Sequence, residues 1–223
     1  ISTGVLIYFI HHASTIIQVS QVILNVSKDL DRAIDRLYPD SIGHNSQQQT
    51  EELPKQFEQH SAPIRATQKG YLQAIDDEEL MEIARRADIL LCIQSRPGKY
   101  VIPSTPLVLV YPHTHISPKL VKQIKRAFIF GNERTEQQDI AFPIEQLVEI
   151  ALRAISPAVN DPFTAIRCID RLAASLSRLA QRSFPSSYRY DHKQKLRVIA
   201  KPTTFEYLVD RAFNQIRQYA QSD

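Results

Sequence analysis

Hydrophobic positions at the start of the chain recur with a heptad period. One series is spaced seven residues apart, and a second series occupies the d positions between its members: Phe9, Ile16, Ile23, Leu30 and Leu37, with Val5, His12, Val19, Val26 and Ala33. This a/d pattern predicts a long amphipathic helix that ends before Pro39. Ile17, Leu24 and Ile34 widen the apolar stripe, so the helix is expected to pack on more than one neighbour.

The stripe has two interpretations at this point. It is the core helix of a monomer, or it is an oligomerisation helix that pairs with copies of itself. The second interpretation assigns the contacts between copies to seven a and d positions of this helix: Phe9, His12, Ile16, Val19, Ile23, Val26 and Leu30. His12 breaks the apolar pattern and is interpreted as a satisfied interface histidine or as a pH-sensitive group.

A change of pattern divides the rest of the chain. Residues 39–63 are rich in Gln, Ser and His and are predicted to be a polar linker. Residues 64–116 show β-branched runs and are predicted to form a small β-rich subdomain. Its expected elements are a strand over 64–76 interrupted at Gly70, a helix over 78–87 capped by Asp76 or Asp77, and strands over 89–95 and 100–112 joined by the turn 96–99. Pro103, Pro106 and Pro112 indicate edge strands or bulges.

Residues 117–223 are predicted to form a helical subdomain. A helix is expected over 119–130 with Gly131 as its C-cap. Thr135 and Gln138 fit a capping box for the next helix, whose start Pro143 resets or kinks. Asp161 and Pro162 fit the N-cap and first position of another helix. A short strand over 196–200 precedes a last helix that opens at Thr203 or Thr204.

The resulting prediction is an α+β chain with a long N-terminal heptad helix, a small β-rich subdomain with one helix, and a C-terminal helical bundle. The predicted boundaries are 1–38 for a membrane-proximal or oligomerisation helix, 39–63 for the linker, 64–116 for the β-rich subdomain and 117–223 for the helical subdomain.

Composition bears on the kind of partner and on the cellular compartment of the protein. The 223 residues carry a formal net charge of only +3, and the basic run over 119–126 fits a solvated helix face, so no nucleic-acid partner is expected. Cys92 and Cys168 lie in apolar segments and are expected to be free thiols of a reducing compartment. The chain begins at Ile1 and its one methionine is Met81, so we expect a piece of a longer protein.

The first ten residues are uncharged and almost all apolar. That length is too short to cross a bilayer, which needs about 20 apolar residues. It also lacks the basic start of a signal peptide. Two interpretations remain open from the residues, namely the last turns of a spanning helix or an ordinary buried helix start.

No strong catalytic motif is present. The chain has no G-x-S-x-G, no Gly-rich phosphate loop and no H-E-x-x-H, and its five glycines argue against a dinucleotide fold. His113 and His115 have no further ligand residues at metal-site spacing nearby, so neither a metal nor a cofactor is predicted.

Polar residues at two helix junctions are the candidates for a ligand or interface site. They flank the two predicted helix starts: Arg134, Thr135, Asp139, Asn160, Asp161, Thr164 and Arg167. Three interpretations stay open, namely a structural corner, a ligand or interface site, and a catalytic site whose residues are unknown. Arg134 could pair with Asp139 or with Asp161.

Several blocks of the chain resemble, in this order, a bacterial family of predicted membrane proteins called domain of unknown function twenty-two fifty-four. The blocks are FIHHASTIIQVS, GYLQAIDDEEL, RPGKYVIPSTPLVLV, GNERTEQQDIAFPIEQLVEIALRAISPAVNDPFTAIRCIDRL and FEYLVDRAFNQIRQYA. The resemblance covers Ile7 to Tyr219, and its most specific parts are RT-x-x-QD and SP-x-x-NDP-x-TA. The chain departs from the family at Ser104 and Pro143, where glycines are expected.

The resemblance implies transmembrane helices followed by this extramembrane region, with residues 1–10 as the end of the last spanning helix. It brings no established activity and no catalytic residues. Our leading hypothesis is an extramembrane assembly, gating or sensing domain of a multi-pass bacterial inner-membrane protein, channel-like or transporter-like, homo-oligomeric, and on the cytoplasmic face. The alternative is an enzyme or small-ligand-binding domain whose site is the Arg134, Asp139, Asn160 and Asp161 junction.

Overall fold

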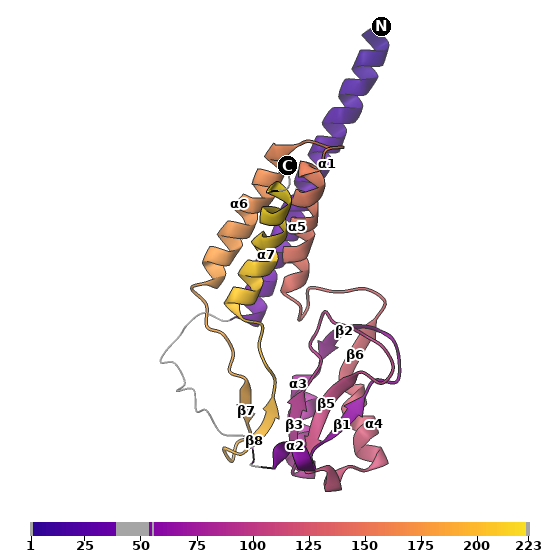
Figure 1. The fold of residues 1–223 in the computed structure, drawn as a ribbon, viewed down its shortest axis with the longest axis vertical. Coiled ribbons are helices and arrows are strands. Elements are labelled where there is room, and N and C mark those ends of the chain that lie inside the picture. The colour runs from indigo at the N-terminus through magenta and orange to yellow at the C-terminus, as the bar shows by residue number, and fades with distance from the viewer. Residues whose placement is uncertain (1, 39–53, 55, 222–223) are drawn as a thin grey trace. The chain divides into compact units, whose positions relative to one another are not determined.

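The computed structural model describes residues 2–38, 54 and 56–221, with side chains from Gln18 onward. The chain divides into two compact units, each assembled from separate stretches of sequence (Figure 1). The helical unit comprises residues 1–40, 140–182 and 204–223, and the sheet unit comprises 41–139 and 183–203. The predicted α+β class, with an N-terminal helix, a β-rich part and C-terminal helices that pack together, is confirmed.

Four long helices form the described part of the helical unit. They are α1 (Ser2–Leu37), α5 (Ala141–Ile155), α6 (Pro162–Leu179) and α7 (Phe205–Ala220). Asp161 caps α6 and Thr204 caps α7, each by accepting a hydrogen bond from a backbone amide three residues ahead, as predicted. Pro143 lies in the first turn of α5, where its missing amide hydrogen costs no helical bond.

The C-terminal half of α1 belongs to the core of this unit. Ile23, Val26, Leu30 and Ala33 of the predicted heptad stripe are buried, and α1 packs on both α5 and α6. Partners on two sides explain why Ile34, outside the a/d series, is buried as well. The stripe from Ile23 onward is therefore covered by helices of the same chain. The side chains of Phe9, His12 and Ile16 lie outside the described residues.

The sheet unit contains a mixed sheet, an antiparallel sheet and short helices. Its larger sheet has the order β1-β5-β3-β8-β7, built from Ala62–Arg65, Pro106–Tyr111, Leu90–Ile93, Leu196–Ile199 and Tyr188–Tyr190. Its smaller sheet has the order β4-β2-β6, built from Tyr100–Val101, Gly70–Ile75 and Phe128–Gly131. The helices are α2 (Phe57–His60), α3 (Asp77–Ala87), a 3-10 turn η1 (His113–His115) and α4 (Pro118–Arg126).

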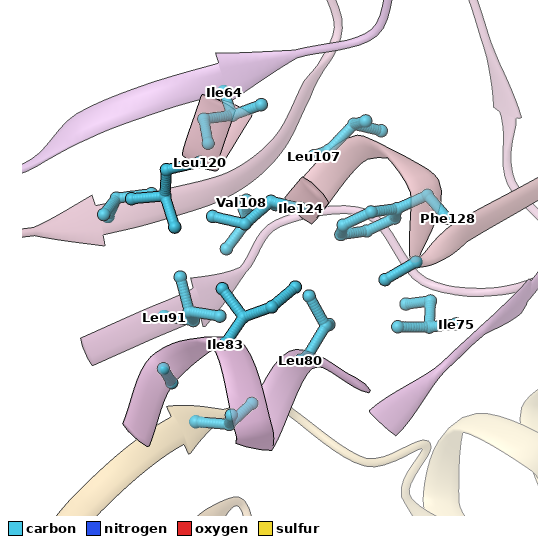
Figure 2. Packing of buried hydrophobic residues seen from close by; sticks show 14 of the residues in the cluster. Ile64, Ile75, Leu80, Ile83, Leu91, Leu107, Val108, Leu120, Ile124 and Phe128 are labelled. Atoms are coloured by element: carbon cyan, nitrogen blue, oxygen red, sulfur yellow. The ribbon is translucent and has the colours of Figure 1, made fainter. Parts of the chain in front are cut away.

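A hydrophobic core packs the helices α3 and α4 of the sheet unit against its strands. Leu80 and Ile83 of α3 and Leu120 and Ile124 of α4 point into a common cluster with strand residues (Figure 2). Each helix presents apolar residues at intervals of three or four positions, so a single face is buried and the basic residues of α4 stay at the surface. The solvated basic face expected for residues 119–126 is thus present.

Three predicted elements of the sheet unit were wrong. The strand expected over 64–76 is two strands, β1 and β2, that belong to different sheets. The strand expected over 100–112 is also two strands, β4 and β5, which lie in different sheets, although the turn 96–99 that precedes it is present. The helix expected over 119–130 ends at Arg126, and residues 128–131 form β6, which pairs with β2. Aromatic and β-branched residues in FIFG favour a strand, and that preference prevails once β2 offers an edge.

Pro106 lies at the first residue of β5, which is flanked by β1 and β3 and is therefore an interior strand rather than an edge. The ladder accommodates the proline because the register shifts between Ile64 and Arg65 opposite it. The predicted bulge is confirmed and the edge position was wrong. Pro103 and Pro112 lie outside the strands.

The sequence-based boundaries differ from those of the units. Residues 117–139 and 183–203, assigned by sequence to the helical subdomain, belong to the sheet unit and supply α4, β6, β7 and β8. Most of the predicted linker lies outside the described residues. Its end contributes α2, whose Phe57 is buried against Leu90 and Ile199.

Candidate functional site

The loop Glu133–Asp139, called the clasp loop here, is held to strand β2 of the sheet unit by side-chain hydrogen bonds. The Ile75 amide donates to Gln138 Oε1 at 2.9 Å, and Gln138 Nε2 donates to the Ile75 carbonyl at 3.0 Å. Gln73 Nε2 donates to the Glu133 carbonyl at 2.8 Å. The capping box expected from Thr135 and Gln138 was therefore wrong: Gln138 pairs with β2, and α5 begins without a side-chain cap.

Arg134 and Asp139 form an ion pair at the base of the clasp loop. Nε and Nη2 of Arg134 both donate to Asp139 Oδ2, at 2.9 and 2.6 Å, and the aspartate is only 7% exposed. A buried carboxylate needs such a partner to remain charged. Gly98 of the turn 96–99 lies against this carboxylate, because a Cβ on Gly98 would stand 2.1 Å from Asp139 Oδ2. The pairing of Arg134 with Asp139, one of two expected options, is confirmed.

Thr135 contributes one unusual polar atom to this loop. Its hydroxyl oxygen is buried and has no hydrogen-bond partner among the described residues. A buried hydroxyl without a partner costs about 1–3 kcal/mol.

The α5–α6 turn contains the second set of candidates. Asp161 Oδ1 accepts from the Thr164 amide at 3.1 Å, and the Thr164 hydroxyl donates to Asp161 Oδ2 at 2.7 Å. The Thr164 hydroxyl is the main group that lowers the pKa of Asp161. Asn160 has a φ of 49°, in the left-handed region that asparagine tolerates better than most residues. The turn is closed by backbone bonds from Asn160 to Ser156 and from Asp161 to Ala154.

The sequence-predicted residues are thus divided between the units. Arg134, Thr135 and Asp139 belong to the sheet unit, and Asn160, Asp161, Thr164 and Arg167 belong to the helical unit. Each candidate carboxylate is satisfied inside its own unit, Asp139 by Arg134 and Asp161 by Thr164. Geometry within each unit therefore accounts for both acids as structural groups, and the enzyme or ligand-binding alternative stays a prediction.

An ion-pair network in the sheet unit was not predicted. Arg197, buried on β8, donates from Nε to Asp191 Oδ2 at 2.8 Å and from Nη1 to Asp88 Oδ1 at 2.7 Å. The hydrogen bond from Arg197 is the largest cause that lowers the pKa of Asp191 to about 2. Lys195 and then Arg197 lower the pKa of Asp88 to about 2. The segment DHKQK is a turn signal that could have revealed the β7–β8 hairpin, but not the distant Asp88.

A surface depression can be described in each unit. The first, of about 420 Å³, lies between α5 and α7 and is lined by Glu145, Tyr207, Asp210, Arg211, Asn214 and Gln215. The second, of about 410 Å³, is bordered by Lys122, Lys125 and Arg126 of α4. None of the candidates named from sequence lines either depression.

Nearby groups of the sheet unit contact the rings of His113 and His115. Nδ1 of His113 lies 2.9 Å from the His60 carbonyl, and Nδ1 of His115 lies 3.1 Å from the Ala87 carbonyl. Within the described residues, no three His, Cys, Asp or Glu side chains gather as a metal site would require. Cys92 and Cys168 are free thiols, and burial raises the pKa of Cys168 to about 11.

Comparison with known proteins places the chain in a family. The profile of the family described as "Predicted membrane protein (DUF2254)" matches residues 1–223. The uncharacterized proteins Rv1290c of Mycobacterium tuberculosis and Mb1321c of Mycobacterium bovis are each 32% identical to the chain over 227 residues, which cover 98% of it. The chain spans 42% of the length of these relatives.

Two further findings accompany this match. No solved structure matches the chain. Across the part of the chain that the structure describes, every helix is too short or too polar to cross a bilayer. With a match over its whole length, the chain belongs to the DUF2254 family of predicted membrane proteins.

Proposed function

We propose that this chain is an extramembrane assembly, gating or sensing domain of a multi-pass bacterial membrane protein of channel or transporter type, and that it carries no catalytic site of its own. One observation carries the proposal. The helix α1 has an uncharged N-terminal half, and its C-terminal half is buried in the helical unit against α5 and α6. A single rigid element therefore links the apolar segment to the folded bundle.

Side-chain contacts fix α1 to α6. The Ser175 hydroxyl donates to Asp31 Oδ1 at 2.8 Å, and Arg178 Nη2 donates to Asp35 Oδ1 at 2.5 Å. Ala33 and Ile34, between these acids, are fully buried. Close-packed interiors transmit displacement because they resist compression. A shift or rotation of α1 would therefore be passed to α6, as a sensing or gating element requires.

Homo-oligomeric assembly is the second part of the proposal. Ile23, Val26 and Leu30 are already buried within the chain, so the assembly contacts are confined to the preceding heptads, at Phe9, His12, Ile16 and Val19. An a/d stripe that continues in the sequence on the N-terminal side of these buried residues supports this part. Free thiols favour the reducing, cytoplasmic face of an inner membrane.

The test is the mass of the full-length protein in detergent, measured by light scattering. We expect a homo-oligomer that Ile16→Asp dissociates, because a carboxylate at an a position would be buried without a partner. Gln21→Asp is the matched control, since Gln21 is exposed on the opposite side of the same helix. A strict monomer for the unsubstituted full-length protein would refute assembly.

A further inference from the structure

Three exposed apolar side chains gather at the α5–α6 turn. Val159 is 54% exposed, Phe163 is 71% exposed and Ile166 is 51% exposed. Phe163 and Ile166 are three residues apart on α6 and so share a face, and Val159 precedes them in the turn. We call these three residues the apolar corner.

The fold of the helical unit does not use the apolar corner. The opposite face of α6 supplies the buried residues, including Ala165, Cys168 and Leu172. The turn itself is closed by backbone bonds and by the Asp161 cap. Grouped apolar side chains at a surface mark an interaction site more often than scattered ones do.

The apolar corner lies where α1 leaves the bundle. Arg167 Nη1 donates to Ser20 Oγ at 2.9 Å, which places the start of α6 beside that point of α1. Residues 2–19 contain no Asp, Glu, Lys or Arg and continue the helix for about 27 Å at about 1.5 Å per residue. Figure 1 shows this part of α1 extending past the α5–α6 turn.

The stretch of sequence around the apolar corner is nearly free of charged residues, and an arginine stands at each end of it. Residues 154–166 contain one charged group, Asp161, which is engaged in the cap. Arg153 and Arg167 flank this stretch, and both are exposed. An apolar tip backed by arginines is the pattern of a surface that enters the boundary between lipid headgroups and acyl chains, where arginine side chains reach anionic headgroups.

We propose that the apolar corner inserts into the surface of the bilayer from which α1 emerges, with Arg153 and Arg167 facing the headgroups. This inference rests on the proposed extramembrane role. It makes the α5–α6 turn a second contact with the membrane besides α1. A bundle held at two points would be oriented on the lipid surface, and movement of α1 would change the depth of the corner.

The experiment measures depth in the full-length protein reconstituted into vesicles of phosphatidylcholine and phosphatidylglycerol. A fluorescent label is attached to Phe163→Cys in a background without other reactive cysteines, and nitroxide-bearing lipids serve as the quencher. Ala173→Cys, exposed further along α6, is the matched control. Ile166→Cys provides a second position in case the first variant does not fold.

We expect lipid-borne quenching at Phe163 and Ile166 to be at least about twofold stronger than at Ala173, and to weaken when phosphatidylglycerol is omitted. Equal quenching at all three positions overturns the inference. Protection of the corner from both lipid-borne and aqueous quenchers also overturns it, because a protein partner then covers the corner. Flotation of the vesicles separates this result from the proposed function: protein that fails to float refutes the membrane role itself.

Discussion

Gln138 and Ile75 are joined by two hydrogen bonds although 63 residues separate them in sequence. The carboxamide of Gln138 takes the place of a neighbouring strand and satisfies both backbone groups of Ile75 at the end of β2. The clasp loop is thereby held to the sheet that precedes it.

Gln138→Ala should lower the free energy of unfolding by about 2 kcal/mol, because the partly buried amide and carbonyl of Ile75 lose their partner. Urea denaturation measures the loss. Gln68→Ala removes the same group from an exposed turn and should change stability by less than about 0.5 kcal/mol. Equal losses in the two variants would contradict the assignment.

Gly98→Ala should destabilise the protein by more than about 1 kcal/mol, since Gly98 has a φ of 86° and lies against Asp139. Gly131→Ala is the comparison, because its new Cβ would meet the flexible Gln73 side chain at 2.3 Å. Thermal unfolding of both variants should give the larger drop for Gly98. The reverse order would show that the turn 96–99 is not fixed by the Arg134–Asp139 pair.

Ser104→Gly should stabilise the protein by about 0.5 kcal/mol. Pro103 and Ser104 occupy the centre of a turn closed by a 3.0 Å bond from the Thr105 amide to the Ile102 carbonyl, and Ser104 has a φ of 75°. This geometry fits a type II turn, whose third position prefers glycine. Chemical denaturation checks the sign, and a loss of stability would indicate that the serine side chain contributes an interaction of its own.

Asn160→Gly should leave stability within about 0.5 kcal/mol, whereas Asn160→Val should cost about 1 kcal/mol or more, because a β-branched residue strains the left-handed backbone. Asp161→Ala should cost about 0.5–2 kcal/mol by removing the N-cap of α6. Circular dichroism during urea unfolding measures all three. If Asn160→Gly instead abolishes oligomer formation or lipid contact of the full-length protein at unchanged stability, the asparagine side chain has a functional role.

Acid should weaken the sheet unit through Asp88 and Asp191. The pKa of each is lowered to about 2 from an ordinary 3.8, so their contribution to stability is present above the ordinary value and is lost as pH falls towards 2. The Asp88→Asn, Asp191→Asn double variant should therefore lose less stability than the parent between about pH 5 and pH 2. Urea unfolding across that range tests this, and an unchanged slope would assign the acid transition to other carboxylates.

Local chemistry made some parts of the structure predictable. The heptad stripe identified α1, and the caps at Asp76, Asp161 and Thr204 fixed three helix starts. These features depend on contacts within four residues or on a single helix face. The candidate residues at the helix junctions were recognisable for the same reason, because capping and turn residues are polar.

Sequence by itself determined the long helices, the capped starts of α3, α6 and α7 and the α+β class, since these follow from periodicity and near-neighbour hydrogen bonds. Only the tertiary structure decided which strands share a sheet, because β6 becomes a strand when β2 supplies its hydrogen bonds. It also decided the partners of the polar residues. Gln138 contacts a strand instead of a helix start, and Arg197 meets Asp88 from 109 residues away. Such pairings depend on how the chain returns on itself, which no local pattern specifies.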